Sequence, residues 1–226
     1  MSPYRKRRVE RLFCVLGRQQ AERARATRSA ILSDDMPQRT ATILSNLFQP
    51  MLTGTYVLLA IALTSATTWT SGVAWGVGLA LLTAGVPSAD IFRRMRVRTV
   101  DDFHIVVRTQ RLGPLLVALS CTAAGLALAL AMGAPHPLQA SLLVALVTGV
   151  VLTSITGVWK ISFHAATAVS ALVILTWWLG WGALALAPLA PAVAWSRVAL
   201  GRHSSAQVVA GGAVGATLAL AVLALY

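Results

Sequence analysis

Apolar residues form seven long runs along this chain. The runs cover about residues 44–66, 70–91, 114–133, 139–158, 164–180, 182–195 and 205–225, with Gly, Pro, Trp or charged residues between them. Because a hydrocarbon core about 30 Å thick takes roughly 20 helical residues to cross, this pattern predicts an all-α integral membrane protein with about seven transmembrane helices. Only the Gly-Trp-Gly segment 180–182 separates the fifth run from the short sixth run, so six helices with one long kinked span is the alternative. Within the last run, Gly211 and Gly215 have the small-xxx-small spacing of a close helix contact.

The first 40 residues differ from the rest of the chain. They contain ten Lys or Arg, four of them in a row at positions 5–8, and four acids. The segment is too long and too polar for the amino-terminal region of a secretory signal peptide. We therefore expect a basic cytosolic segment over residues 1–40 and a single transmembrane bundle over residues 41–226.

The composition agrees with a membrane protein and excludes several other classes. Of the 226 residues, 57% are hydrophobic and 12% are charged, and the mean hydropathy is +0.72, which is too apolar for a water-soluble protein of this size. A net charge of +12 would suggest nucleic acid binding in a soluble chain, but here the distribution of the charges indicates membrane topology, and no nucleic acid partner is expected. Cys14 and Cys121 form neither a disulfide framework nor a Cys-x-x-Cys pair.

The basic residues indicate which side of the membrane each loop faces. A chain that starts in the cytosol and crosses seven times places loops 92–113, 159–163 and 196–204 on the cytosolic side and loops 67–69, 134–138 and 180–182 outside. The first 40 residues and the three cytosolic loops contain all 19 Lys and Arg, and the outer loops contain none. By the positive-inside rule, we expect the amino terminus and these three loops in the cytosol. The short helices rich in Ala, Leu and Gly fit a bacterial inner membrane.

All seven acids also lie on the cytosolic side or at its membrane boundary. Asp90 is expected to form an ion cluster there with Arg93 and Arg94. Asp101 and Asp102 invite a comparison with membrane prenyltransferases, which hold magnesium diphosphate between two aspartate-rich helices, but a second such cluster is missing. We therefore expect no metal site.

The most specific candidate site precedes the last apolar run. Ser196, Arg197 and His203 occur as Ser-Arg-x5-His, and Gln207 follows four residues later. This spacing resembles the third signature of the type 2 phosphatidic acid phosphatase superfamily, Ser-Arg-x5-His-x3-Asp, with Gln207 in the position of the acid.

Two further segments resemble the remaining signatures in the order that the family has them. The sequence KISFH at residues 160–164 is similar to Pro-Ser-Gly-His and keeps its serine and histidine. Arg111 matches the arginine of the first signature, Lys-x6-Arg-Pro, and His104 stands seven residues before it, where the lysine is expected. The resemblance covers residues 104–207, about half of the chain, and the charge pattern places its three segments at one membrane face.

The resemblance implies a role for each of these residues. In the family the histidine of the third signature attacks phosphorus and forms a phosphohistidine, so His203 is the expected nucleophile and His164 is the general acid that protonates the leaving oxygen. Gln207, one helical turn after His203, is expected to orient the imidazole through a hydrogen bond. The expected phosphate-binding residues are Arg197, Arg111, Ser162, Ser196, Lys160 and His104. This scheme requires no metal and no other cofactor.

The sequence therefore predicts a membrane lipid-phosphate phosphatase with its active site at the cytosolic face. Its expected partners are the bilayer and a lipid phosphate or diphosphate monoester of the isoprenyl or phosphatidate type. The alternative is a phosphatase-like protein that has lost turnover and acts as a lipid-phosphate binder or scaffold. Gln207 in place of Asp and Phe163 in place of Gly favour this alternative. A transporter would usually place ionisable residues in mid-membrane, where this chain has almost none.

Overall fold

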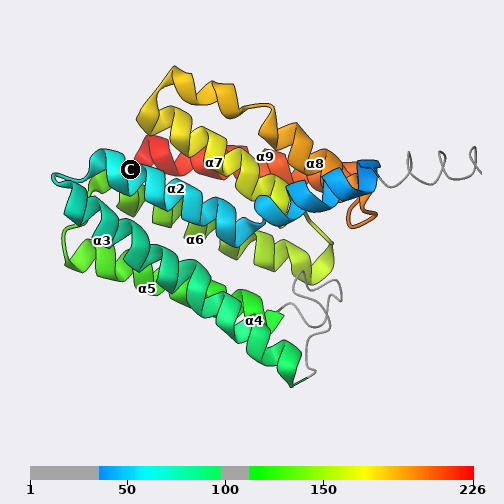
Figure 1. The fold of residues 1–226 in the computed structure, drawn as a ribbon, viewed down its shortest axis with the longest axis horizontal. Coiled ribbons are helices and arrows are strands. Elements are labelled where there is room, and N and C mark those ends of the chain that lie inside the picture. Colours follow the sequence, from blue (N-terminus) through cyan, green and yellow to red (C-terminus); the bar gives the residue numbers. More distant parts are fainter. Residues whose placement is uncertain (1–35, 98–111) are drawn as a thin grey trace, which may run out of the picture. The chain divides into compact units, whose positions relative to one another are not determined.

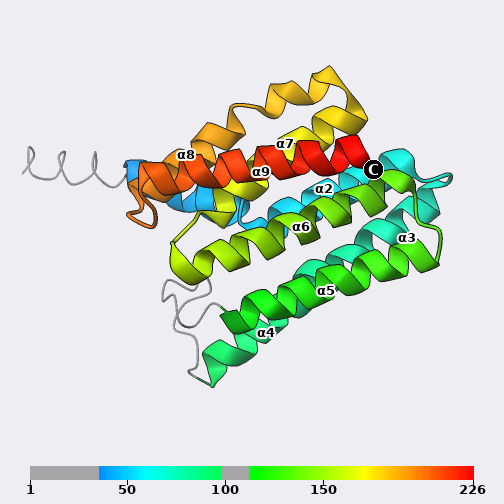
Figure 2. The same ribbon diagram turned by 180° about the vertical axis from the view of Figure 1, so that it is seen from behind.

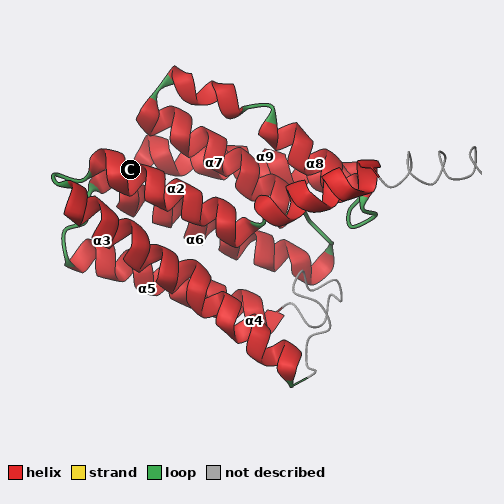
Figure 3. Cartoon of the chain, viewed as in Figure 1, coloured by secondary structure: helices red, strands yellow, loops and turns green. Residues whose placement is uncertain are grey.

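The computed structural model describes residues 36–97 and 112–226. Over these residues the secondary structure is helical and contains no strand (Figure 3). The chain divides into two units, Met1–Thr40 and Ala41–Tyr226, and the second unit is a helical bundle. The predicted all-α class is therefore confirmed for the described part of the chain.

The bundle consists of successive helices joined by short connections. A helix over Met36–Leu47 precedes α2 (Pro50–Ser65), α3 (Trp69–Ala80), the π-helical segment η1 (Leu81–Gly85), α4 (Val86–Arg96), α5 (Leu112–Ala131), α6 (His136–Val158), α7 (Phe163–Leu179), the 3-10 helix η3 (Trp181–Leu186), α8 (Leu189–Ala199) and α9 (Ser205–Leu225). The segments α3, η1 and α4 form one helix of 28 residues.

All seven apolar runs of the sequence are helical, but fewer than seven helices have the length of a membrane span. Within the described residues, five are long and apolar enough to cross a membrane: Trp69–Arg96, Leu112–Ala131, His136–Val158, Trp181–Ala199 and Ser205–Leu225. The helices Met36–Leu47 and Pro50–Ser65 meet at a 53° bend and make a sixth span if they act together. The helix α7 has 17 residues and is about 25 Å long, since a helix rises about 1.5 Å per residue. The structure therefore supports five or six spans, where the apolar runs predict about seven.

Two predicted loops begin later than expected. The loop expected at 92–113 is helical up to Arg96, and the loop expected at 196–204 is helical up to Ala199. Both helices continue past the end of their apolar run. They can do so because long basic side chains can stay in a helix while their charged ends reach the aqueous interface. The predicted break at 180–182 is present, since Gly180 has a φ of +86° and the 3-10 helix follows it.

The connections of the Ala41–Tyr226 unit alternate between its two ends (Figures 1 and 2). One end, which we call the basic end, contains the α6–α7 and α8–α9 connections, the end of α4 and the start of α5. The described Lys and Arg of this unit are Arg93, Arg94, Arg96, Lys160, Arg197 and Arg202, and all of them lie in these segments or, for Arg197, in the last turn of α8 beside the α8–α9 connection. The opposite end contains the α2–α3, α5–α6 and α7–η3 connections, which contain neither Lys nor Arg. The loops that the sequence predicts to share one face thus lie at one end of the bundle.

Close packing of α7 against α9 confirms the predicted glycine contact. A β-carbon at Gly211 would lie 2.5 Å from the carbonyl oxygen of Ser162, and one at Gly215 would collide with the carbonyl oxygen of Ala166. The hydroxyl of Ser170 donates to the carbonyl oxygen of Gly215 at 2.9 Å. These glycines let the first half of α9 approach the start of α7, and the two candidate catalytic histidines lie in the first turn of α7 and just before α9.

Candidate functional site

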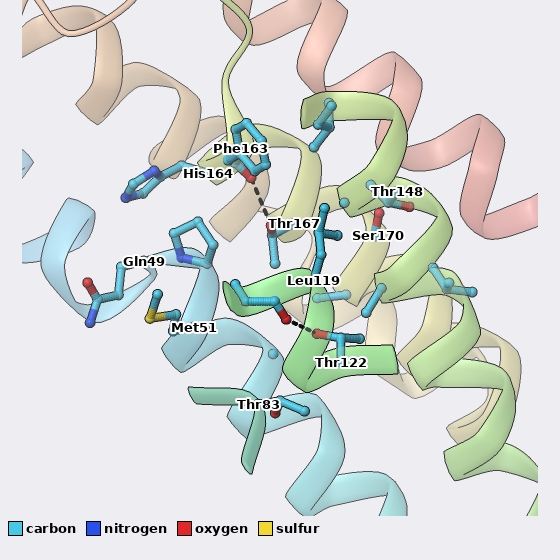
Figure 4. Close-up of a pocket in the computed structure, with 18 of the residues that line it drawn as sticks. Gln49, Met51, Thr83, Leu119, Thr122, Thr148, Phe163, His164, Thr167 and Ser170 are labelled. Atoms are coloured by element: carbon cyan, nitrogen blue, oxygen red, sulfur yellow. Dashed lines mark hydrogen bonds between the residues drawn. The ribbon is translucent and has the colours of Figure 1, made fainter. Parts of the chain in front are cut away.

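A cavity of about 310 Å³ runs into the bundle from the basic end. Its walls come from α2, α5, α6 and α7, with smaller contributions from η1 and α4. Apolar side chains make up most of the wall, and hydroxyl groups such as Thr83, Thr122 and Thr167 lie between them (Figure 4). At one end the lining includes His164, Arg197 and His203 from α7, α8 and the α8–α9 turn. The cavity is therefore amphipathic, and its polar end, which we call the cationic end, contains Arg197 and the two histidines at the basic end of the bundle.

The backbone of the α8–α9 turn fixes the spacing between Arg197 and His203. Gly201 has a φ of +63°, which is a left-handed conformation that glycine adopts without strain. The carbonyl oxygen of Arg197 accepts hydrogen bonds from the backbone N–H of Arg202 at 3.0 Å and from that of His203 at 3.1 Å, and Gly201 N–H donates to Val198 at 2.9 Å. The 202-to-197 and 201-to-198 bonds are those of a Schellman motif. This turn brings the backbone of His203 back to Arg197, which lies in the last turn of α8.

Gln207 makes two hydrogen bonds through the same oxygen. It is the third residue of α9, and its side chain and that of Ser204 form a capping box. The backbone N–H of Ser204 donates to Gln207 Oε1 at 3.1 Å, and His203 Nδ1 lies 3.2 Å from this atom. Because a carbonyl oxygen only accepts hydrogen bonds, this contact places a proton on Nδ1, and in the neutral imidazole the lone pair is then on Nε2. The predicted contact between Gln207 and His203 is present, and it selects the tautomer that a nucleophilic Nε2 requires.

His164 lies in the first turn of α7, and its position is set by Ser162. The Ser162 hydroxyl caps this helix by accepting from Ala165 N–H at 3.3 Å. The Ser162 N–H donates to the carbonyl oxygen of Gln207 at 3.3 Å. Ser162 is fully buried and does not line the cavity, so in this structure it connects the start of α7, which carries His164, to the first turn of α9, which follows His203.

Arg197 is almost completely buried, with 5% of its surface exposed. Its Nη1 donates to the hydroxyl of Ser45, which is also buried and lies on the helix Met36–Leu47. The two residues are 152 positions apart, and a lone serine in an apolar run gives no signal that would connect it to a distant arginine. Ser45 is thus a residue that the sequence analysis missed.

A second missed residue is Gln49, at the break between the first helix and α2. Its side chain lines the cavity and lies toward the end that His164 occupies (Figure 4). The signal for it is weak, because the sequence shows only a Gln-Pro pair inside an apolar run. The amide adds a neutral hydrogen-bonding group near the cationic side chains.

The other candidate residues lie elsewhere. The hydroxyl of Ser196 donates to the carbonyl oxygen of Val193 at 2.7 Å within α8, and Lys160 is in the α6–α7 connection but does not line the cavity. Two predicted phosphate-binding residues, His104 and Arg111, and the pair Asp101 and Asp102 fall outside the described residues.

The predicted ion cluster at the end of α4 is present. Asp90 accepts from Arg93 Nη2 at 2.9 Å and from Arg94 Nε at 2.5 Å. Over residues 36–97 and 112–226, no group of three or more His, Cys, Asp or Glu is arranged to hold a metal ion.

Comparison with known proteins identifies no relative of this chain. No family model matches the chain, and neither a curated protein nor a solved structure gives a match.

Proposed function

We propose that this protein is a membrane lipid-phosphate phosphatase, similar to the type 2 phosphatidic acid phosphatases, that works through a phosphohistidine. The observation that carries the proposal is the meeting of His203, His164 and Arg197 at the cationic end of an otherwise apolar cavity. An apolar cavity with a few convergent polar groups is the usual form of a small-molecule site. Its two chemical halves suit a substrate with a phosphate head and a hydrocarbon tail.

In the first step His203 Nε2 attacks the phosphorus atom of the monoester. The lone pair of Nε2 forms the P–N bond while the bond between phosphorus and the ester oxygen breaks, and that oxygen takes a proton from the imidazolium of His164 and leaves as an alcohol. A diphosphate substrate reacts in the same way, with a lipid monophosphate as the leaving group. Histidine suits the general acid role because its ordinary pKa of about 6.5 is near neutral pH.

In the second step water hydrolyses the phosphohistidine. Neutral His164 takes a proton from the water as its oxygen attacks phosphorus, and the P–N bond breaks and returns its electron pair to His203 Nε2. The products are inorganic phosphate and the two histidines in their starting protonation states. Each histidine thus has one role in each half of the cycle.

Arg197 is the described residue best suited to hold the phosphoryl oxygens. A guanidinium can donate two parallel hydrogen bonds to phosphate, and Ser45 holds one of its terminal nitrogens in place. A preorganised cation stabilises the charge that develops in the transition state. By the family resemblance, Arg111 and His104 complete the phosphate site.

We further propose that the site faces the cytosol of a bacterial inner membrane. The support for this orientation is the positive-inside rule applied to the basic end. A cytosolic site favours newly made lipid phosphates over substrates that arrive from outside.

The experiment that tests the proposal is phosphate release by the protein in lipid nanodiscs without added metal. The substrates are farnesyl phosphate, farnesyl diphosphate and phosphatidate, and the variants are His203→Ala, His164→Ala and Arg202→Ala. The arginine variant is the matched control, since Arg202 neighbours His203 in the chain but does not line the cavity. We expect release that His203→Ala abolishes and that Arg202→Ala leaves within about twofold. Release that survives His203→Ala would refute the phosphohistidine.

The second candidate function is lipid-phosphate binding without turnover, and Gln207 is the observation that favours it. A neutral glutamine orients His203 but does not stabilise the imidazole when it becomes positive, as a carboxylate would. Gln207→Glu separates the two functions, because it keeps the reach of the capping box and adds the charge. A phosphatase should become faster, whereas a binding protein should still release no phosphate while it binds the same lipid.

A further inference from the structure

We propose that the cavity holds a hydrocarbon tail to a depth of roughly 12–14 carbons in line, so that the ligand is a lipid phosphate whose tail enters the bundle between α2, α6 and α7. The inference rests on the proposed function for the reaction at the phosphate, but the shape of the tail site stands on the cavity alone. It narrows the substrate to lipid phosphates whose tail reaches about 17 Å into the bundle.

The length of the cavity follows from the helices that form its walls. Its lining extends along α6 from Thr153 to Ser141 and along α7 from Phe163 to Ile174. At about 1.5 Å per residue, these stretches measure about 18 and 16 Å. The cationic groups lie at the Phe163 end, so the space available to a tail is about 17 Å deep.

The number of carbons follows from the depth. An extended chain advances about 1.25 Å for each carbon, from C–C bonds of about 1.5 Å at tetrahedral angles. A depth of about 17 Å then accepts about 13 carbons in line, close to the main chain of a farnesyl group. A polyprenyl tail several times longer has to leave the cavity.

Gly54 controls access to the deeper part of this space. It lines the cavity on α2, and a β-carbon added there would meet no atom within 4 Å. Gly54 lies one helical turn, about 6 Å, after Pro50, which lines the same cavity beside Gln49. A larger side chain at Gly54 would therefore block a tail beyond its first five or so carbons while leaving the cationic end unchanged.

The test compares Gly54→Leu with Gly78→Leu in lipid nanodiscs. Gly78 is a matched control, because it also lies within a helix, has nothing within 4 Å of an added β-carbon, and does not line the cavity. Both changes replace glycine by a better helix former, so neither should prevent folding. The substrates are butyl phosphate and dodecyl phosphate, and each variant is compared with the native protein on the same substrate.

We expect Gly54→Leu to lower kcat/KM for dodecyl phosphate by roughly tenfold or more and to leave kcat/KM for butyl phosphate within about twofold. Gly78→Leu should change neither value. Equal effects of the two substitutions on dodecyl phosphate would overturn the tail site.

A binding measurement keeps this test separate from the proposed reaction. Dodecylphosphonate has a carbon–phosphorus bond that a phosphatase does not hydrolyse, and butylphosphonate is its short-tailed control. We expect dodecylphosphonate to raise the unfolding temperature of the native protein and of Gly78→Leu, but not that of Gly54→Leu. This pattern together with no release of phosphate from any substrate would refute the phosphatase and support the tail site. Stabilisation of all three proteins to the same degree would overturn the tail site, whatever the phosphate assay shows.

Discussion

Substitution of Gly211 by Ala tests whether close packing of α7 on α9 positions the two histidines. The added β-carbon would lie 2.5 Å from the carbonyl oxygen of Ser162, which is about 0.8 Å short of a carbon–oxygen contact. A backbone carbonyl cannot rotate away as a side chain can. The start of α7 therefore has to move away from α9, and His164 moves with it.

Gly212→Ala is the matched control, because its β-carbon would lie at an ordinary distance of 3.4 Å from Val169 Cγ2. Both substitutions gain about 1 kcal/mol of helix propensity, so this term cancels between them. Overpacking costs about 1–3 kcal/mol, and we expect Gly211→Ala to be less stable than Gly212→Ala by this amount. A displacement of about 1 Å in an active site can lower the rate by about 100-fold, so phosphate release by Gly211→Ala should fall by roughly tenfold or more.

The assays are unfolding in mixed detergent micelles with increasing dodecyl sulfate, followed by helical circular dichroism, and phosphate release in nanodiscs. The free energies of unfolding of the two alanine variants are compared with each other rather than with the native protein. Equal stability of Gly211→Ala and Gly212→Ala would refute the packing argument. A clear loss of stability with unchanged phosphate release would show that the contact is structural and does not position His164.

Three further predictions concern the backbone and hydrogen bonds of the site. Gly201→Ala puts a β-carbon at a φ of +63° and should lower the free energy of unfolding by about 1–2 kcal/mol. Gly201→Asn should lower it less, because Asn adopts this conformation more readily. Equal losses for the two variants would contradict this prediction. Ser45→Ala removes the buried acceptor of Arg197 Nη1 and should lower the free energy of unfolding by about 1–3 kcal/mol. Ser45→Thr keeps the hydroxyl and is the control. A loss for Ser45→Ala that is no larger than the loss for Ser45→Thr would count against this contact. Gln207→Ala removes the acceptor of the capping box and of His203 Nδ1. It should lower the free energy of unfolding by about 1 kcal/mol and phosphate release by roughly tenfold or more. Unchanged release would show that His203 needs no orienting partner.

Length and apolarity were sufficient to predict where most helices lie. The last run was expected at 205–225, and α9 covers Ser205–Leu225. This agreement has a local cause, because Ser204 and Gln207 form a capping box that starts the helix at the position where the apolar run begins. The basic ends of α4 and α8 were misplaced because the helix continues through residues that the apolar pattern excludes.

Arg197 and His203 were predictable from the sequence, but the residues that contact them from distant segments were not. The spacing of Arg197 and His203 depends on one turn, so a local pattern contains it. The hydrogen bond between Arg197 and Ser45 and the cavity depend on tertiary packing between distant segments. Gly54 leaves the cavity open, whereas Gly211 makes a close helix contact. The sequence alone does not distinguish these two kinds of glycine.

The glutamine that weakens the family resemblance has a structural reason at this site. The third position of a capping box favours Glu or Gln, because the side chain has to reach back to the backbone N–H of the cap. An aspartate is one methylene shorter and would have to give up either this bond or the bond to His203. Gln207 Oε1 makes both, so the residue keeps the imidazole in its tautomer and gives up only the negative charge. Turnover by Gln207→Glu above that of the native protein would show that this charge is what the site lacks, and no gain with an intact fold would favour the binding function.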